Sequence, residues 1–411
     1  MSASFYDLLK YAKTGVASPD MTAYDKQKAL SMCKAGFPVK TLTGVPPISF
    51  KSDGSALTAW SISGNMVQTG TPTPTVPIQP EETGDRTGNL VRIASDNMII
   101  YSTYNNFTLQ DGKITTTGNT LVGFIAKVDA STEYTVSMSM NAGTMRIREY
   151  SAMPTTWTDD FIVQSVNDQS SNRYKKQTFT TNQSTEYVLV TYYTNQSGNE
   201  CYYIMLNAGS TALDYEPYGY KLEISCGGQT YNAYIKEQLR KIGDYSDVLN
   251  SDGTVTRKIY KHIINGTENV FNSLWGAWEW SFPSGFTVIP DAITTPKVIT
   301  VICSHYAAKG NCASGEGLPA SYGDNIVCFR DYMSTLLIKD TRFSTREDFA
   351  EYLQQQYSSG TPVTIWYVLS QPKTEQFDAP QIQTVKGANT FAVETTLPPS
   401  EVSITGHIKS N

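Results

Sequence analysis

Three tryptophans stand close together in the run LWGAWEW: Trp275, Trp278 and Trp280. On a β-strand, Trp278 and Trp280 point to the same face of the sheet. A pair of flat indole rings is a surface on which the C–H face of a sugar ring stacks, because each ring buries a large area with little loss of side-chain entropy. The run is therefore a candidate sugar-binding site if this face is exposed; the alternative is that the rings fill a hydrophobic core.

A second candidate is the run WTDDFI, which places Trp157 beside Asp159 and Asp160. It would supply an aromatic-plus-carboxylate contact to a glycan; the alternative is an ordinary loop. Four tyrosines in two neighbouring strand-like runs are further candidates: Tyr192, Tyr193, Tyr202 and Tyr203. Because successive residues of a strand face opposite sides, half of each pair must face outward, either as a binding surface or as solvent-facing tyrosines.

The sequence contains none of the G-x-S-x-G, H-E-x-x-H or Walker-type motifs of common enzymes. The loop SGEGLPASYG has glycines at Gly315 and Gly317 followed by Ala320, but Pro319 and the lack of a following helix remove the helix N-terminus on which a pyrophosphate sits. We therefore expect no cofactor and no enzyme activity. One enzyme class stays open, because a glycan depolymerase needs only two carboxylates that the fold brings together.

Metal binding has little support in the sequence. The three histidines, His262, His305 and His407, are far apart. The six cysteines show no C-x-x-C spacing: Cys33, Cys201, Cys226, Cys303, Cys312 and Cys328. This pattern fits neither a disulfide-dense scaffold nor a zinc site, so we expect reduced, mostly buried thiols and no metal.

Composition narrows the class of protein. The chain has 411 residues, of which 40% are hydrophobic and only 17% charged, with 26 tyrosines. This length allows two or three domains, and the residue types favour short strands with polar faces. A net charge of −6 gives no basic stripe for nucleic acid. We find no apolar run long enough to span a bilayer and no signal-peptide pattern, so we expect no membrane insertion.

The first 37 residues predict a helical hairpin. Phe5, Leu8, Leu9 and Ala12 follow the i, i+3, i+4, i+7 spacing of an amphipathic helix. A second helical run, TAYDKQKALSMCKAG, contains Leu30 and ends at glycine followed by proline. Two such short helices bury too little apolar area to be stable alone. Residues 1–37 are therefore predicted to be an attachment segment that packs on another protein or another copy.

Short strands and a proline-rich run follow in residues 38–80. The run GNMVQTGTPTPTVPIQP, residues 64–80, cannot be helix interior or a central strand, because proline lacks a backbone donor and has a fixed φ. Extended proline-rich chain is stiff and needs no internal hydrogen bonds. We predict an extended spacer that holds the attachment segment away from the domains beyond it.

The remaining chain is predicted to be mainly β, with two antiparallel β-sandwich domains of the jelly-roll type. Residues 81–220 hold alternating runs separated by turns, with a tight hairpin at Asp111-Gly112. Residues 221–373 hold a second set of strands and one helix at 345–358, capped by Ser344 with Glu347. Residues 374–411 are predicted to be a strand-like tail.

Four stretches, between about residues 40 and 370, resemble segments found in the same order in virion structural proteins of phages that infect Gram-positive bacteria. They are GNMVQTGTPTPTVPIQPEETGDRTGNL, IMLNAGSTALDYEPYGYKLEI, LRKIGDYSDVLNSDGTVTRKIYKHI and SSGTPVTIWYVLSQP. Those proteins are described as minor tail, tail-fibre or baseplate components. In that family the region before a YEPY-like segment, here residues 215–218, resembles the sandwich of carbohydrate-binding modules.

The resemblance implies a virion appendage that is assembled in the bacterial host cytoplasm. It would dock on other virion proteins through the N-terminal segment and contact host cell-surface polysaccharide through its sandwiches. A homo-oligomer, first of all a trimer, is expected from virion symmetry. Two alternatives stay open: a head fibre or capsid decoration protein built from the same modules, and a glycan depolymerase.

Overall fold

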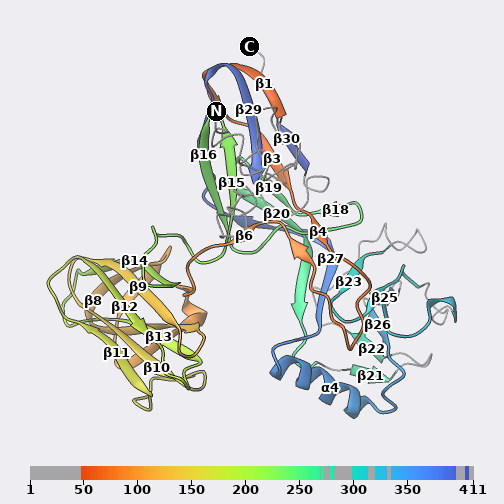
Figure 1. Cartoon of the computed structure of the whole chain (residues 1–411), viewed down its shortest axis with the longest axis horizontal. Helices are drawn as coiled ribbons and strands as arrows, with labels where there is room; N and C mark the ends of the chain where they lie inside the picture. Colours follow the sequence, from red (N-terminus) through yellow and green to blue (C-terminus); the bar gives the residue numbers. More distant parts are fainter. Residues whose placement is uncertain are drawn as a thin grey trace, which may run out of the picture. The chain divides into compact units, whose positions relative to one another are not determined.

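The computed structural model describes residues 48–268, 270–272, 278–281, 299–312, 320–330, 335–394 and 403–406 (Figure 1). The predicted attachment segment, with Phe5, Leu8, Leu9, Ala12 and Leu30, lies outside these residues, as does Trp275. The described chain is mainly β with antiparallel sheets, as the sequence predicts. Among the described strands, only β24 (Ala307–Ala308) and β25 (Ile326–Arg330) pair in parallel.

The chain divides into two compact units. Unit 2 comprises Gly84–Lys221 and Ala233–Gln238, compared with the predicted first sandwich at 81–220. Unit 1 comprises the described residues before Gly84, together with Leu222–Asn232 and those from Leu239 onward. Unit 2 is thus an insertion in the sequence of unit 1.

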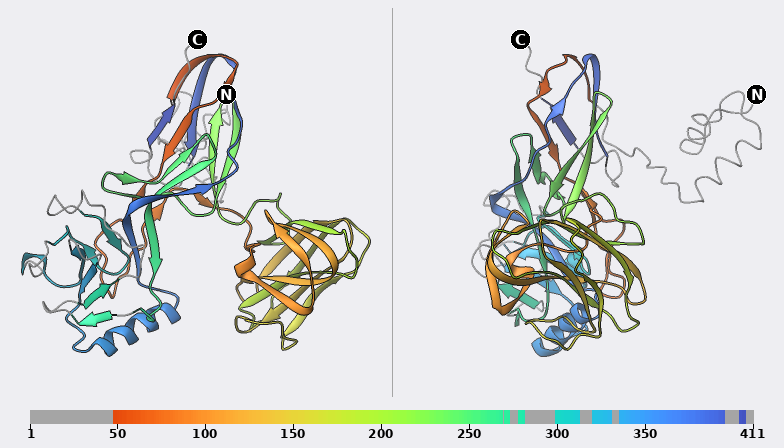
Figure 2. Two further views of the ribbon diagram at one scale, coloured as in Figure 1. Left: turned by 180° about the vertical axis from the view of Figure 1, so that it is seen from behind. Right: turned by 90° about the vertical axis from the view of Figure 1, so that its left-hand side faces the viewer.

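The strands of unit 2 form one sheet that folds round a common core (Figures 1 and 2). The strands are β7 (Met98–Gln110), β8 (Lys113–Lys127), β9 (Glu133–Met140), β10 (Thr144–Tyr150), β11 (Val163–Asp168), β12 (Tyr174–Thr180), β13 (Tyr187–Thr194) and β14 (Glu200–Ala208). Their order is β11-β10-β13-β8-β14-β9-β12, and β7 pairs with β8. A short 3-10 helix, Ser95–Asn97, precedes β7.

The long strand β8 connects the two layers of unit 2. Its residues 120–127 pair with β13, whereas Ile114 and Thr115 pair with β14. Apolar side chains from both layers, such as Val122, Phe124, Val136 and Met138, form a single buried cluster. The predicted hairpin between β7 and β8 is confirmed, because Asp111 and Gly112 both have positive φ, at 49° and 71°.

The inserted sandwich begins and ends at neighbouring residues. The N–H of Thr87 donates to the carbonyl of Gly219 at 3.1 Å, and the N–H of Gly219 donates to the hydroxyl of Thr87 at 3.2 Å. Beside this contact, β6 (Asp85–Arg86) pairs with the first residues of β15 (Tyr220–Cys226). The incoming and outgoing strands of residues 88–218 are therefore hydrogen-bonded to each other.

The described residues of unit 1 form three larger sheets and one α-helix, α4 (Arg346–Ser358). The first sheet has the order β1 (Ile48–Asp53), β29 (Lys386–Glu394), β15, β16 (Gln229–Ile235). The second is β23 (Val301–Cys303), β27 (Thr364–Gln376), β20 (Thr254–Ile263), β19 (Val248–Asn250), β3 (Trp60–Ser63), β30 (Ser403–Gly406). The third is β21 (Val270–Asn272), β22 (Trp278–Ser281), β26 (Thr335–Lys339), β25, β24.

Short pairs complete unit 1: β2 (Ala56–Leu57) with β28 (Ile382–Gln383), β4 (Met66–Val67) with β5 (Glu81–Glu82), and β17 (Lys241–Ile242) with β18 (Tyr245–Ser246). A 3-10 helix spans Ala320–Tyr322. The core lies between the second and third sheets and is covered by α4, whose Phe349 and Leu353 are fully buried. The cap of α4 differs from the prediction by one residue: Thr345, not Ser344, accepts the N–H of Asp348 at 3.1 Å.

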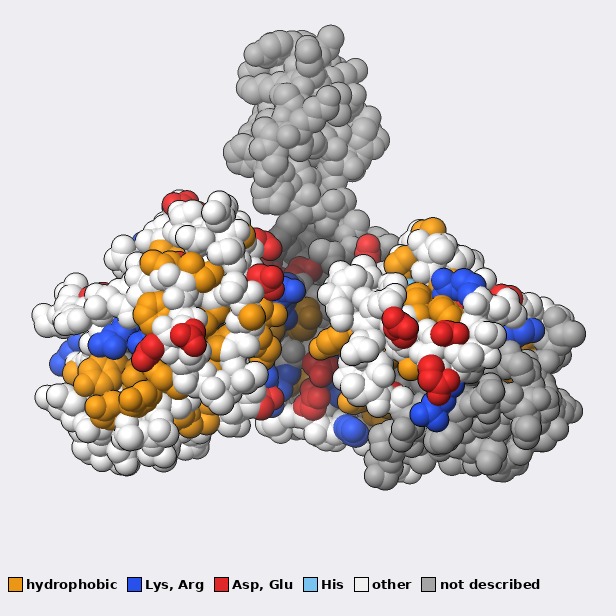
Figure 3. All heavy atoms as spheres, turned by 90° about the horizontal axis from the view of Figure 1, so that it is seen from below, with side chains coloured by type: hydrophobic (Ala, Val, Ile, Leu, Met, Phe, Trp, Pro, Cys, Tyr) orange, Lys and Arg blue, Asp and Glu red, His pale blue; other side chains and the backbone are white. Residues whose placement is uncertain are grey.

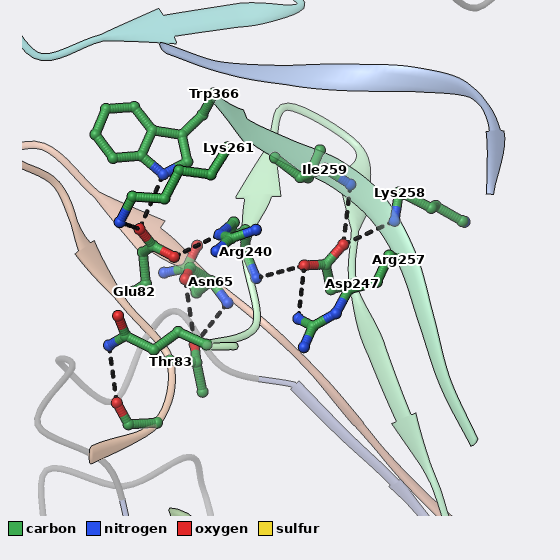
Figure 4. Close-up of polar contacts among 12 residues, drawn as sticks. Asn65, Glu82, Thr83, Arg240, Asp247, Arg257, Lys258, Ile259, Lys261 and Trp366 are labelled. Carbon is green, nitrogen blue, oxygen red and sulfur yellow. Dashed lines mark hydrogen bonds and ion pairs between the residues drawn. The ribbon is translucent and has the colours of Figure 1, made fainter. Parts of the chain in front are cut away.

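A buried ionic cluster centres on Glu82 of β5 (Figure 4). Its carboxylate accepts from Arg240 Nε at 2.5 Å, from Lys261 Nζ at 2.9 Å and from the indole N–H of Trp366 at 2.8 Å. Burial raises the pKa of Glu82, but Arg240 and Lys261 outweigh burial and hold that pKa below its usual value. The cluster joins β5, β20 and β27, which are far apart in sequence.

Asp247 forms the second centre of this cluster (Figure 4). Its carboxylate accepts the backbone N–H groups of Lys258 and Ile259 at 2.7 and 2.9 Å and pairs with Arg257 at 3.2 Å. Burial raises the pKa of Asp247 above its usual value despite these partners. A carboxylate that is buried with this many donors holds β20 in one conformation at 257–259, where its register with β27 shifts.

The proline-rich run differs from the extended spacer that the sequence predicts. Thr73 and Val76 exchange backbone hydrogen bonds at 3.1 Å, so the chain turns back on itself at Pro74. Ile78 donates to the carbonyl of Ser304 at 2.7 Å, and the amide of Gln68 donates to the carbonyl of Cys303 at 2.9 Å. The segment is thus packed on unit 1, because its carbonyls and amides find partners there.

The C-terminal strands also differ from the predicted separate tail. β29 pairs with β1, and β30 pairs with β3, so the last described strands lie beside the first ones. Both belong to the main sheets of unit 1. The five cysteines within the described residues are buried and form no disulfide with one another, as predicted. Two of them, Cys312 and Cys328, have their sulfur atoms 3.1 Å apart.

Candidate functional site

The outer face of unit 2 is built on β10 and β13. Along β10, Met145 and Ile147 point into the core, whereas Arg146 and Arg148, which alternate with them, lie on the opposite face. On the paired strand β13, Tyr192 lies in the core and Tyr193 is partly exposed. Alternation along two strands therefore gathers arginine and tyrosine side chains on one face of the sheet.

The loop between β10 and β11 lies against this face. The N–H of Ile162 donates to the carbonyl of Glu149 at 2.7 Å, and the hydroxyl of Tyr150 donates to the carbonyl of Thr158 at 3.2 Å. Trp157 and Phe161 pack on a small buried cluster formed by Ile99, Tyr150 and Leu189. The loop is therefore held by its own hydrophobic contacts, and the ring of Trp157 has a fixed position.

Arg148 connects this loop to the sheet. Its guanidinium lies 4.5 Å from the ring centroid of Trp157 and 4.9 Å from that of Phe161. It also pairs with Asp159 at 3.2 Å. Because Arg148 is buried and Asp159 is 78% exposed, the carboxylate neutralises the arginine while keeping most of its own surface in water.

Four aromatic rings form a continuous row on this face, which we call the aromatic row: Trp157, Tyr101, Tyr104 and Tyr193. The ring centroids of Trp157 and Tyr101 are 5.5 Å apart, those of Tyr101 and Tyr104 5.2 Å, and those of Tyr104 and Tyr193 6.1 Å. All four side chains are partly exposed. Tyr101 and Tyr104 stack although they are three residues apart, since the register of β7 shifts between Ile100 and Asn105.

A pocket of about 340 Å³ opens beside Tyr193 at the end of the row. Three segments line it, at 141–144, 169–172 and 193–196. They supply five carboxamide side chains, those of Asn141, Gln169, Asn172, Asn195 and Gln196. They also supply the hydroxyls of Thr144, Ser170, Ser171, Tyr193 and Thr194. The described lining includes no charged side chain. The pocket therefore offers both hydrogen-bond donors and hydrogen-bond acceptors but no net charge.

The first wall of the pocket depends on Gly143. Its φ is +129°, and a Cβ atom there would meet Tyr192 Cε2 at 2.5 Å and the carbonyl oxygen of Tyr193 at 2.7 Å. The buried hydroxyl of Tyr192 donates to the carbonyl of Ala142 at 2.9 Å. The side chain of Asn141 accepts the N–H of Glu200 at 2.7 Å. Only glycine allows this close approach of the turn to the core tyrosine.

The second wall is held by a buried lysine. Lys175 is 1% exposed, and its ammonium donates to the carbonyl of Ser170 at 2.7 Å and to both the carboxylate and the carbonyl of Asp168 at 3.2 Å. Burial raises the pKa of Asp168, but Ser170 and Lys175 outweigh it and lower that pKa below its usual value. The buried ammonium of Lys175 therefore holds the loop that carries Gln169 and Ser170, although Lys175 itself does not line the pocket.

Hydrophobic side chains are exposed in groups on unit 2. Figure 3 shows one side of this unit on the left, where orange patches lie among uncharged polar atoms and scattered charges. Exposed apolar or aromatic residues of the unit include Met153, Ile162, Val163, Tyr174, Tyr203, Leu213 and Tyr215. Such a surface offers stacking and hydrogen bonding rather than strong charge attraction.

The structure places the predicted site residues in different parts of the chain. Trp157 and Asp159 belong to the aromatic row and its loop, so this candidate lies at the site. Trp278 and Trp280 lie on strand β22 of unit 1, and their side chains, like the whole of Trp275, are outside what the structure describes. The predicted tryptophan platform therefore stays a prediction.

The four predicted tyrosines differ in their exposure to solvent. Tyr192 is buried in the core and Tyr193 joins the site, as alternation requires. In contrast, Tyr202 is partly exposed and Tyr203 is 54% exposed, because β14 shifts register at Tyr202 and Tyr203 takes a positive φ of 55°. The ring of Tyr203 contacts those of Tyr202 and Tyr215, at centroid distances of 4.9 and 4.8 Å.

Several site residues have no local signal in the sequence. Tyr101, Tyr104 and the pocket-lining amides belong to segments that look like ordinary polar strands and turns. Their role depends on a register shift and on three turns that are distant in the chain. The composition favoured short strands with polar faces, but it did not indicate where on them a binding surface lies.

Comparison with protein-family models finds no match for this chain, and no curated protein matches it. Within the described residues, no cluster of three or more His, Cys, Asp or Glu side chains could hold a metal ion. None of the helices that the structure describes has the length and apolar character needed to cross a membrane. The site is therefore interpreted from its own chemistry, which combines aromatic stacking with uncharged hydrogen bonding.

Proposed function

We propose that this protein is a phage virion appendage whose unit 2 binds a host cell-surface glycan. The observation that supports glycan binding is the aromatic row ending in an uncharged pocket lined by amides and hydroxyls. Sugar rings present apolar C–H faces and many hydroxyls, and this arrangement offers a partner for each. The assignment to a virion is supported by the four sequence stretches that resemble phage structural proteins.

The aromatic row suits an extended glycan rather than a single sugar. Its rings come from the 151–162 loop, from β7 and from β13, so consecutive sugar units could contact different elements of one rigid face. Hydrophobic packing under Trp157 and the stacking of Tyr101 on Tyr104 hold the rings in place before binding. Preorganised rings lose little entropy on binding, so less of the contact energy is offset by ordering the site.

Weak contacts become effective when many copies act together. A trimeric appendage present in several copies on one particle would raise the apparent affinity by orders of magnitude without any new contact. We propose this arrangement for the protein, with the N-terminal segment docking on other virion proteins. Imaging of labelled protein on whole particles distinguishes a tail position from a head position.

A substitution in the aromatic row tests the glycan-binding proposal. Tyr104→Ala removes one partly exposed ring of the row, and we expect binding to purified host cell-wall polysaccharide to weaken about tenfold. Tyr174→Ala is the matched control, because Tyr174 is 53% exposed and lies on β12 in the other layer. Isothermal titration with the full chain measures both variants.

Two results would contradict the proposal. One is that the wild-type protein binds neither purified wall polysaccharide nor intact host cells at saturating concentration. The other is that Tyr104→Ala and Tyr174→Ala weaken binding equally, which would show that the row is not the contact surface.

A further inference from the structure

Arg146 lies over the ring of Tyr193, one of the described residues that line the pocket. Its guanidinium carbon is 5.1 Å from the ring centroid of Tyr193. Arg146 follows Thr144 by two residues on β10, and Thr144 is paired with Tyr193 and lines the pocket. The arginine is partly exposed. Its positive charge is therefore available beside the uncharged cavity.

The charge of Arg146 has no partner in the described part of the protein. No hydrogen bond or ion pair of the guanidinium is found there, and its Nε is buried without an acceptor. The residues paired with Arg146 on the neighbouring strands, Asn167 and Thr191, are uncharged. By contrast Arg148, two residues further on, is neutralised by Asp159.

We propose that Arg146 binds an anionic group of the glycan, a phosphate or a carboxylate, while an adjoining sugar or polyol unit occupies the Tyr193 pocket. This inference rests on the proposed function and names its ligand class. A guanidinium that lies over an aromatic ring can still donate the N–H groups of its exposed end, and two such groups match two oxygens of one anion. The contact with the ring and the buried Nε also restrict the side chain, so little side-chain freedom is lost on binding.

The neutral pocket explains why Arg146 can discriminate between ligands. The described pocket lining holds no carboxylate that would repel an anion and no second cation that would attract it independently. The ammonium of Lys175 is engaged by Asp168 and Ser170 beneath the pocket. A preference for anionic glycan should therefore depend on one side chain.

The test compares three polymers: glycerol-phosphate teichoic acid, polygalacturonate and dextran, which carry phosphate, carboxylate and no charge. We expect the full-length protein to bind at least one of the two anionic polymers about tenfold more tightly than dextran. The polymer that binds best identifies the anion. Arg146→Gln should abolish the preference, and the preference should weaken as salt rises.

Two further variants separate charge from geometry. Lys176→Gln removes one positive charge from an exposed position on β12 and should leave the preference unchanged. Arg146→Lys keeps the charge but not the planar fork, and we expect about a threefold loss for the anionic polymer. Thermal unfolding of each variant shows whether the fold is intact.

Wild-type protein that binds neither anionic polymer better than dextran overturns this inference. So does Arg146→Gln protein that is folded and keeps the preference. In both cases the glycan-binding proposal stands as long as Tyr104→Ala still weakens binding to host wall polysaccharide. That proposal fails only if the wild-type protein does not bind this polysaccharide, or if substitutions in the aromatic row do not change the affinity.

Discussion

Replacing Lys175 with methionine should loosen the pocket from beneath without touching its surface. Methionine keeps the length and apolar stem of lysine but removes the ammonium, so Ser170 and Asp168 lose the donor that fixes their loop. The side chain is 1% exposed, so solvent cannot take its place without entering the sandwich. The glycan would then have to order this loop on binding.

The size of the effect follows from the contacts. A hydrogen bond to a charged group contributes about 1.5–3 kcal/mol to stability. The ammonium of Lys175 makes its shortest contact, 2.7 Å, to the Ser170 carbonyl and longer ones to Asp168, whose side chain is 20% exposed and can be hydrated. We therefore expect a net loss of about 2 kcal/mol in the free energy of unfolding of unit 2, which lowers its Tm by about 6 °C.

The assay combines calorimetric unfolding of the full chain with titration of host wall polysaccharide. We expect the transition of unit 2 to move while that of unit 1 stays, and the affinity to fall about fivefold because the loop must be ordered on binding. Lys176→Met is the matched control, since Lys176 is the exposed neighbour on the same strand. If Lys175→Met changes neither Tm nor affinity, or if Lys176→Met changes both equally, the buried ammonium does not hold the pocket.

Three further predictions follow from the geometry. Gly143→Ala should lower the Tm of unit 2 by several degrees and weaken glycan binding, because the φ of +129° and the 2.5 Å approach to Tyr192 leave no room for a Cβ atom. Calorimetry measures the Tm and titration measures the affinity; a variant in which neither changes would refute the close packing. Glu82→Gln should lower the free energy of unfolding of unit 1 by about 3 kcal/mol, since Arg240 and Lys261 lose their buried counter-charge. Urea unfolding measures this free energy, and a decrease of less than about 1 kcal/mol would contradict the prediction. The pKa of Glu82 is lowered in the folded protein, so the ionised carboxylate stabilises the fold above the unfolded pKa near 4.3, and this stabilisation is lost as the pH falls below that value. The Tm of the wild-type protein should therefore fall between about pH 7 and pH 3, and the Tm of Glu82→Gln should fall less steeply.

The sequence was sufficient to predict the class of fold and several local features. Period-two alternation and turn residues predicted antiparallel strands, and the Asp111-Gly112 pair predicted the β7–β8 hairpin, because both signals act between near neighbours. The helix at 346–358 was predicted for the same reason. The proline-rich run shows the limit. Local rules excluded helix and strand, but contacts with Ser304 and Cys303, more than two hundred residues away, decided that it packs on unit 1.

The candidate site was predicted only in part. Trp157 and Asp159 were recognised because an aromatic residue beside acidic ones is a visible local pattern. Tyr101 and Tyr104 were not, since a register shift in β7 breaks the alternation on which the prediction depends. The pocket could not be predicted at all, because its walls come from three turns whose proximity is a product of the whole sandwich.

The hydrogen-bonded pair Thr87 and Gly219 gives the sandwich a property of its own. Residues 88–218 leave and rejoin the chain at one point, so any module with similarly close ends could replace them at small entropic cost. Such a cassette could be exchanged by recombination while the strands on either side keep their partners. On the proposed function, such an exchange would change the bound glycan in one step and leave the remainder of the polypeptide untouched.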